Sequence, residues 1–173
     1  HQREAYIERI SYGFDLETLY VCIAYRNPAE LGAMVDEKYR KQFLIEIELR
    51  ARLEHCLRFV VDLDEVWRES RHPKIPRDDM ITYRLYRKGE AGEKLEEVAI
   101  GESLRTEKVT ELAVAFDQLG LRPGDHVELS ATMYPINHGR RFDSAMPVER
   151  CPKKGNIHFT VPDELFELDN WVV

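Results

Sequence analysis

Hydrophobic and polar residues alternate one by one along most of this chain. The alternation is strongest over residues 18–26, 42–49, 55–61, 81–87, 127–133 and 157–161. In the first of these segments, the apolar residues on one side are Leu19, Val21, Ile23 and Tyr25. Because the side chains of a strand point alternately to its two sides, this pattern predicts antiparallel strands with one side against a core.

Weaker alternation marks four further strands, at 6–12, 95–100, 104–108 and 111–116. Helical patterns are scarce: residues 29–40 and 62–70 are each predicted to form about two turns, and 116–119 about one turn. Turn-forming residues separate the strands along the chain. We therefore predict an all-β fold, a single antiparallel β-sandwich over 1–173 that is immunoglobulin-like in size, with one or two short helical turns.

Local chemistry also predicts how some of the strands are joined. Gly13 is expected to take the turn conformation between the first two strands, because glycine tolerates backbone angles that other residues avoid. Asp15 is expected to accept hydrogen bonds from neighbouring amides. Pro123-Gly124 is expected to reverse the chain into the strand at 127–133.

Composition and charge narrow the class of partner. The proportions of 43% hydrophobic and 33% charged residues are those of a globular domain and not of a disordered chain. A net charge of −7 argues against a nucleic-acid partner. No apolar run approaches the roughly 20 residues that cross a bilayer, so no membrane partner is expected. Three cysteines without CxxC spacing favour a reduced, cytoplasmic setting, with one long-range disulfide left open.

The sequence offers no recognisable catalytic motif. It has no nucleophile elbow and no glycine-rich phosphate loop. Its six histidines never stand at a metal-ligand spacing such as HxH or HxxxH. His126 and His158 are predicted on the outward sides of their strands, which leaves open a zinc or iron site assembled from distant strands. We assign no catalytic residue, no metal ligand and no cofactor at this point.

Flat aromatic side chains near arginines offer one binding hypothesis. A pyranose ring stacks its apolar side on an aromatic ring, while charged and amide groups bind the sugar hydroxyls. The candidate carbohydrate-binding residues are Trp67, Tyr86, Tyr134 and Arg140. The alternative is that the aromatic ones belong to the fold, with Tyr86 and Tyr134 half-buried on strands and Trp67 closing one end of the sandwich.

Three segments attract attention by their order along the chain. They are 12–21 (YGFDLETLYV), 111–125 (ELAVAFDQLGLRPGD) and 147–152 (PVERCP), the last followed by Gly155 and Val161-Pro162. The first resembles the opening hairpin of the β-sandwich that follows the catalytic barrel in bacterial glycoside hydrolase family 57 proteins. The second resembles the crossover shared by glucodextranase-type C-terminal domains and the DOMON-like group, and the third resembles the closing segment of the same module. Two positions depart from the family pattern, since Ala115 replaces a proline and Cys151 an aromatic residue.

The resemblance implies a DOMON-like order of connections and a noncatalytic accessory domain, the C-terminal fragment of a longer, α-glucan-acting glycoside hydrolase. The implied partner is the N-terminal catalytic domain of the same parent chain, on which the domain packs, or an α-glucan, which it contacts weakly. A start at His1 without an initiator methionine agrees with a fragment. A self-contained β-sandwich that binds a small ligand, a metal or a cofactor is the alternative.

Overall fold

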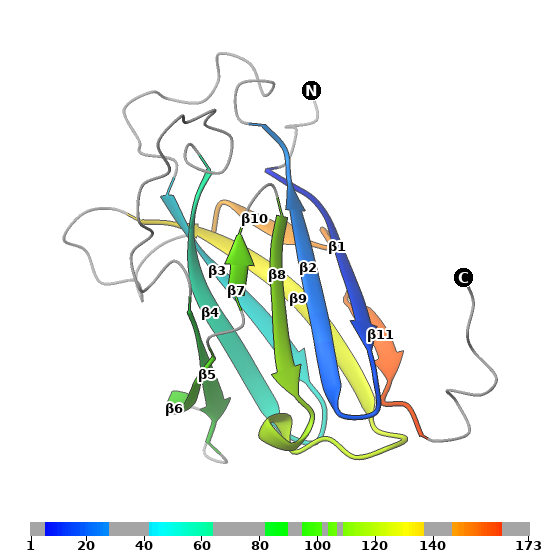
Figure 1. Ribbon diagram of the computed structural model, residues 1–173. Helices are drawn as coiled ribbons and strands as arrows, with labels where there is room; N and C mark the ends of the chain where they lie inside the picture. Colours follow the sequence, from blue (N-terminus) through cyan, green and yellow to red (C-terminus); the bar gives the residue numbers. More distant parts are fainter. Residues whose placement is uncertain are drawn as a thin grey trace.

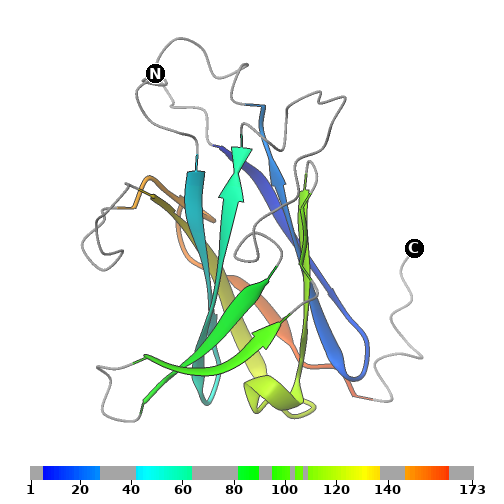
Figure 2. The same ribbon diagram turned by 60° about the vertical axis from the view of Figure 1, so that its left-hand side comes forward.

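Two antiparallel β-sheets lie face to face and bury a shared apolar core, so the protein is an all-β sandwich (Figure 1). The computed structural model describes residues 6–27, 42–63, 82–89, 95–101, 104–106, 109–136 and 147–163. Figure 2 shows the two layers from a second side, with β1, β2 and β8 in one layer and β3, β4 and β9 in the other. The predicted fold class is confirmed.

The smaller sheet has four strands. Its strands, in spatial order, are β1 (Ile7–Phe14), β2 (Thr18–Tyr25), β8 (Val109–Ala115) and β7 (Leu104–Thr106). All three pairings are antiparallel. The strand β2 therefore lies between its sequence neighbour β1 and the distant β8, an arrangement that requires the chain to leave the sheet and return.

The larger sheet has seven strands. Six of them lie in the order β10 (Glu149–Cys151), β9 (His126–Pro135), β3 (Gln42–Arg50), β4 (Glu54–Asp62), β5 (Tyr83–Lys88) and β6 (Leu95–Gly101). The seventh, β11 (Ile157–Thr160), pairs with the same side of β9 as β10 does, nearer the start of β9. Two short strands thus share one edge of a long one.

The inward side chains explain why the two sheets adhere. Alternate residues of β2, β3, β4 and β9 are almost fully buried, among them Leu19, Ile23, Ile45, Ile47, Leu57, Phe59, Leu129 and Met133. Burial of such a side chain stabilises a fold by about 1.5–3 kcal/mol. The period-two pattern of the sequence is therefore the pattern of contact between the sheets.

Polar and aromatic contacts also join the two layers. Tyr83 of β5 is buried, and its hydroxyl donates a 2.7 Å hydrogen bond to the carbonyl of Ala113 in β8, on the opposite sheet. At the other side of the sandwich, the ring of Tyr12 in β1 stacks on Phe159 of β11, with centroids 4.9 Å apart. These contacts fix the position of one sheet over the other.

The β1–β2 turn corrects one prediction. Gly13 lies inside β1, opposite Tyr20, and its φ is not positive, so it is not the turn residue. Asp15 forms the turn instead: its Oδ1 accepts hydrogen bonds from the amides of Glu17 and Thr18, both at 2.8 Å. The side-chain acceptor, rather than the glycine, supplies the chain reversal, because it satisfies amides that the ladder leaves free.

The β8–β9 connection agrees with the prediction. One 3₁₀ turn, η2 (Asp117–Leu119), ends at Gly120, which takes φ +62°, a left-handed conformation that favours glycine. Gly124 follows with φ +86° and reverses the chain. The buried side chain of Leu119 fixes the connection against the core.

The strand predictions are confirmed for ten of the eleven strands, with end shifts of one or two residues. β10 was missed, because its three residues carry no alternating pattern. The predicted helix at 29–40 lies outside the described residues; of the one predicted at 62–70, Asp62 is the last residue of β4 and residues 64–70 lie outside the described residues. All three cysteines are free. Within the described ranges, no helix has the length and apolar character to span a membrane.

Candidate binding face of the larger sheet

The side of the larger sheet that points away from the smaller one carries a group of ionisable and aromatic side chains. We call it the outer face and define it by the residues Glu46, Glu48, Cys56, Arg58, Tyr86, His126, Glu128, Tyr134 and His158. Two of the four predicted carbohydrate-binding residues, Tyr86 on β5 and Tyr134 on β9, lie there, both half-buried. The other two, Trp67 and Arg140, lie outside the described residues.

Arg58 is the centre of the outer face. It lies directly across from Glu46 on the neighbouring strand, and its Nε donates a 2.9 Å hydrogen bond to Glu46 Oε2. Its guanidinium also lies over the ring of Tyr86, 4.9 Å from the ring centroid. A cation over an aromatic ring contributes about 0.5–2 kcal/mol, more when water is excluded. The side chains of Arg58 and Glu46 are only 22% and 12% exposed, so this ion pair is stronger than a surface one.

Cys56 lies beneath this cluster. It is the cross-strand neighbour of both Tyr86 and Glu48, and its own side chain is buried. Burial raises the pKa of its thiol strongly, and the nearby Glu46 carboxylate raises it further. A thiol in this state is a poor nucleophile, because the reactive species is the thiolate. Cys56 therefore supports the cluster by packing.

The two tyrosines keep neutral hydroxyls over the whole range of ordinary pH. Burial raises the pKa of the Tyr86 phenol, and the carboxylate of Glu97 adds to the effect. Burial likewise raises the pKa of Tyr134, with smaller contributions from Glu46 and Glu48. A neutral phenol both donates and accepts a hydrogen bond. Each tyrosine thus combines a flat apolar ring with a polar tip.

The two tyrosines are separated along and across the sheet. Across the sheet, Tyr86 pairs with Cys56, Cys56 with Glu48, and Glu48 with Ser130 of β9. Tyr134 lies four residues beyond Ser130 along β9. Three strand spacings of about 4.8 Å and four residue steps of about 3.4 Å place the two Cα atoms about 20 Å apart. The two rings are therefore too far apart to contact one small molecule at the same time.

The outer face lacks the features of a hydrolytic centre among the residues that the structure describes. Glycoside hydrolysis uses two opposed carboxyl groups, one with a raised pKa. Among the described carboxyl groups, Glu149 has a pKa that burial raises, against the lowering effect of two amide hydrogen bonds. Its two oxygens accept these bonds from the amides of Tyr6 and Ile7 at the side of the sandwich. A carboxyl group engaged in this way joins strands and does not face a substrate.

A second cluster lies at the β9–β11 edge of the outer face. His126 and Glu128 are two residues apart on β9, and His158 of β11 is the direct cross-strand partner of Glu128. His126 Nε2 lies 3.0 Å from His158 Nδ1, and His158 Nδ1 lies 3.7 Å from Glu128 Oε1. The prediction that both histidines face outward is confirmed, since both are exposed. Sequence spacing did not reveal the cluster, because the third residue comes from another strand.

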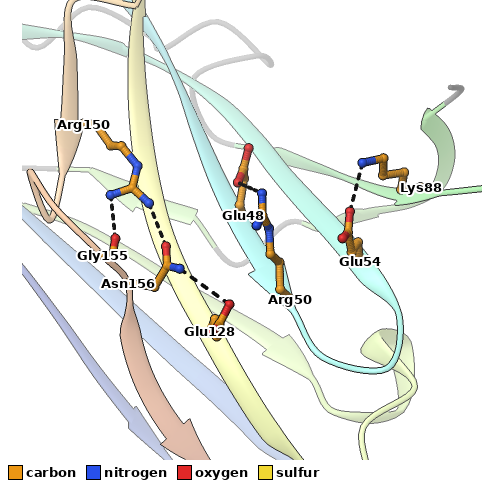
Figure 3. A network of polar contacts seen from close by, with 8 residues as sticks. All are labelled: Glu48, Arg50, Glu54, Lys88, Glu128, Arg150, Gly155 and Asn156. Carbon is orange, nitrogen blue, oxygen red and sulfur yellow. Dashed lines mark hydrogen bonds and ion pairs between the residues drawn. The ribbon is translucent and has the colours of Figure 1, made fainter. Parts of the chain in front are cut away.

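A series of hydrogen bonds leads from Arg150 through Asn156 to Glu128, as Figure 3 shows. Arg150 donates to the carbonyl oxygens of Pro152 and Gly155 and to Asn156 Oδ1, each at 2.6 Å. The Asn156 amide in turn donates to Glu128 Oε2 at 3.5 Å. The other oxygen of Glu128 is thereby left on the side of His158.

Comparison of this chain with protein-family models, with curated proteins and with solved structures gives no match.

Proposed function

We propose that this domain is a noncatalytic accessory module of an α-glucan-acting glycoside hydrolase of the family 57 type, and that it contacts carbohydrate through the outer face of the larger sheet. The observation that supports this most is the Tyr86–Arg58–Glu46 arrangement. It places a guanidinium over one side of an aromatic ring and holds that guanidinium with a carboxylate from the neighbouring strand, which leaves the other side of the ring for a ligand. These are the groups that stack on a pyranose ring and bind its hydroxyls.

The rigidity of the cluster favours binding over an incidental surface role. Arg58 and Glu46 are cross-strand partners within a continuous nine-pair ladder between β3 and β4. Their side chains are held by each other and by the Tyr86 ring. A pre-organised group loses less conformational entropy when a ligand arrives. Weak affinity is nevertheless expected, because an open sheet face buries little of its ligand.

The departure at Cys151 does not remove this surface. Cys151 is paired with Ala131 and packs against the core, so it lies on the inward side of β10. An aromatic residue at that position would serve the packing of the sandwich rather than the outer face. The loss of the aromatic residue is thus compatible with carbohydrate contact at Tyr86.

Affinity electrophoresis in gels that contain glycogen or amylose tests the proposal. We expect the wild-type domain to be retarded, Tyr86→Ala to migrate as in a plain gel, and Tyr86→Phe to keep most of the retardation because the ring is kept. Tyr20→Ala is the matched control, since Tyr20 is 46% exposed but lies on the outer side of the smaller sheet. Unretarded wild-type protein, or loss of retardation only in Tyr20→Ala, would count against the outer face as the binding surface.

The second part of the proposal concerns the parent chain. An accessory domain predicts a reading frame that continues for several hundred residues upstream of His1 and encodes a catalytic barrel. Co-purification of the separately tagged barrel and domain tests whether they pack on each other. A start codon immediately before His1 would contradict the accessory role and favour a self-contained binding domain.

A further inference from the structure

We propose that His126, Glu128 and His158 form a surface site for one divalent transition-metal ion of the Zn²⁺ class. The site does not depend on the carbohydrate proposal, because it lies at the opposite edge of the outer face from Tyr86. Two imidazole nitrogens and one carboxylate oxygen converge there, with all three ligand atoms within 4.8 Å of one another. Imidazole and carboxylate ligands suit Zn²⁺, Co²⁺, Ni²⁺ and related ions, whereas Mg²⁺ and Ca²⁺ prefer oxygen ligands alone.

The distances fit a metal ion with small side-chain adjustments. Ligand atoms about 2.0–2.2 Å from a tetrahedral Zn²⁺ lie about 3.3–3.6 Å from each other. The His126 Nε2 to His158 Nδ1 distance of 3.0 Å is slightly shorter, and the distance of 3.7 Å from His158 Nδ1 to Glu128 Oε1 is slightly longer. The side chains of His158 and Glu128 are 51% and 36% exposed, so both have room to rotate. The open side of the cluster leaves coordination positions for water or for an external donor.

The metal would replace the contact that the two imidazoles make in its absence. At 3.0 Å, one ring nitrogen donates its proton and the other accepts. Coordination needs a lone pair on both nitrogens, so the proton must reside on the other ring nitrogen, His126 Nδ1 or His158 Nε2. This is a change of tautomer within neutral imidazole, and it requires no net release of a proton from a neutral pair.

The backbone holds the three ligands in fixed positions. Val127 and Leu129, which flank Glu128, are fully buried, and so is nearly all of Phe159, which follows His158. The ladder continues beyond β11 through hydrogen bonds from Gly124 N to Val161 O and from Val161 N to Asp125 O. Sites on strands are held more accurately than sites on loops. The relative positions of β9 and β11 therefore do not need to change when a metal binds.

The groups behind the ligands also match a metal site. Metal-ligating carboxylates are oriented by hydrogen bonds from a second layer of residues. Here Asn156 donates to the far oxygen of Glu128, and Arg150 fixes Asn156 (Figure 3). Arg50, the cross-strand neighbour of Glu128 on β3, lies 3.5 Å from Glu48. The positive charge of Arg50 is therefore paired with Glu48 and not with Glu128.

Calorimetric titration of the chelator-treated full chain with ZnCl₂ tests the site. We expect one Zn²⁺ per chain, with affinity reduced about 10-fold or more in His126→Asn, His158→Asn and Glu128→Gln, since each removes one of three ligands. Asn156→Ala is expected to weaken binding by up to about 10-fold through loss of the support to Glu128. MgCl₂ should give no saturable binding. Co²⁺ substitution should give visible absorption bands that His158→Asn loses.

Two control variants guard against binding elsewhere. Glu97→Gln removes a carboxylate from β6, at the opposite edge of the larger sheet, and His138→Asn removes a histidine that is not a proposed ligand; both should bind Zn²⁺ like the wild type. Circular dichroism without metal establishes that every variant is folded, which the exposed positions of the three ligands favour. Absence of Zn²⁺ binding by the wild type, equal affinity in His158→Asn, or loss of binding in a control would each overturn the proposal.

Discussion

The side chain of Glu149 binds the main chain of Ile7, with its Oε1 accepting the Ile7 amide hydrogen bond at 2.9 Å. Its Oε2 accepts a second hydrogen bond, from the amide of Tyr6, at 2.8 Å. Glu149 belongs to β10 of the larger sheet and Ile7 to β1 of the smaller one. One carboxylate thus joins the edges of the two sheets at a place where neither backbone ladder can reach the other.

Replacement of Glu149 should destabilise the fold. Glu149→Ala leaves two partly buried amides without their acceptors, and an unsatisfied buried group costs about 1–3 kcal/mol. We expect a loss of about 2–4 kcal/mol in the free energy of unfolding, measured by urea denaturation. Glu149→Gln keeps one acceptor oxygen and should lose roughly half as much. Glu111 is exposed, so Glu111→Gln should change the free energy of unfolding by less than about 0.5 kcal/mol. An equal loss in Glu149→Gln and Glu111→Gln would refute the contact assigned to Glu149.

His55 should make stability depend on pH below neutrality. It is buried, and burial lowers its pKa, with a further contribution from the positive charge of Arg87. Its Nε2 lies 3.4 Å from Arg87 Nε, the donor, and protonation would abolish that acceptor. Because the folded state binds the proton less readily than the unfolded state, stability falls as pH drops below the ordinary histidine pKa of about 6.5.

Denaturation curves at a series of pH values measure this effect. The slope from His55 has an upper limit of about 1.4 kcal/mol per pH unit. His55→Gln should remove it, and Arg87→Met should reduce it without removing it, since burial is the larger cause. If the free energy of unfolding depends on pH identically in the wild type and in His55→Gln, the lowered pKa of His55 is contradicted.

Gly101 should tolerate no side chain. It is the cross-strand partner of Tyr83, whose ring and hydroxyl occupy the space where a Cβ of residue 101 would stand. Gly101→Ala therefore forces Tyr83 to move and strains its bond to the Ala113 carbonyl. We expect a loss of about 1–3 kcal/mol in thermal or chemical unfolding.

Gly13→Ala is the matched control for this substitution, because Gly13 also lies in a strand and has open space around its Cβ position. It should be neutral or slightly stabilising, by up to about 1 kcal/mol. A double variant, Tyr83→Leu with Gly101→Ala, should cost less than the sum of the two single changes, since the smaller side chain relieves the overlap. Simple additivity would contradict the overlap as the cause.

The three cysteines should differ in their reaction with thiol reagents. Cys56 is buried and its thiol pKa is raised, whereas Cys22 and Cys151 are partly exposed. We expect pulse alkylation of native protein, read by peptide mass spectrometry, to label Cys56 last. In denaturant all three should react at similar rates. Early labelling of Cys56 would mean that the Arg58–Tyr86 layer does not cover it.

The strands were predictable from sequence because the alternation of apolar and polar residues within each strand indicates which of its side chains are buried. The side that holds Leu19, Val21, Ile23 and Tyr25 was identified from alternation alone, and all four residues are buried in the structure. β10 was not predictable, since its identity depends on pairing with β9 and not on any pattern of its own. The Gly13 prediction was wrong because the Asp15 carboxylate competes for the turn.

The candidate site was predictable only in part, for a related reason. A period of two tells which side a residue faces, but not which residue lies across from it. The contact of Arg58 with Glu46 depends on the register of β3 and β4, and that of His126 with His158 on the pairing of β9 with β11. Such partners are 12 and 32 residues apart in sequence, respectively, and no local signal connects them. Clusters on the surface of a sheet require the topology before they can be recognised.

The last described strand, β11, pairs with the larger sheet through β9 over four residue pairs and contacts β1 through the stacking of Phe159 on Tyr12. On its other edge, β9 pairs with β3 over eight residue pairs, and this pairing does not involve β11. Opening of β11 would release His158 and expose Phe159, while the remainder of the larger sheet kept its order. A ligand that bridges β9 and β11 therefore links the last described strand to its neighbour through side chains as well as through the backbone ladder.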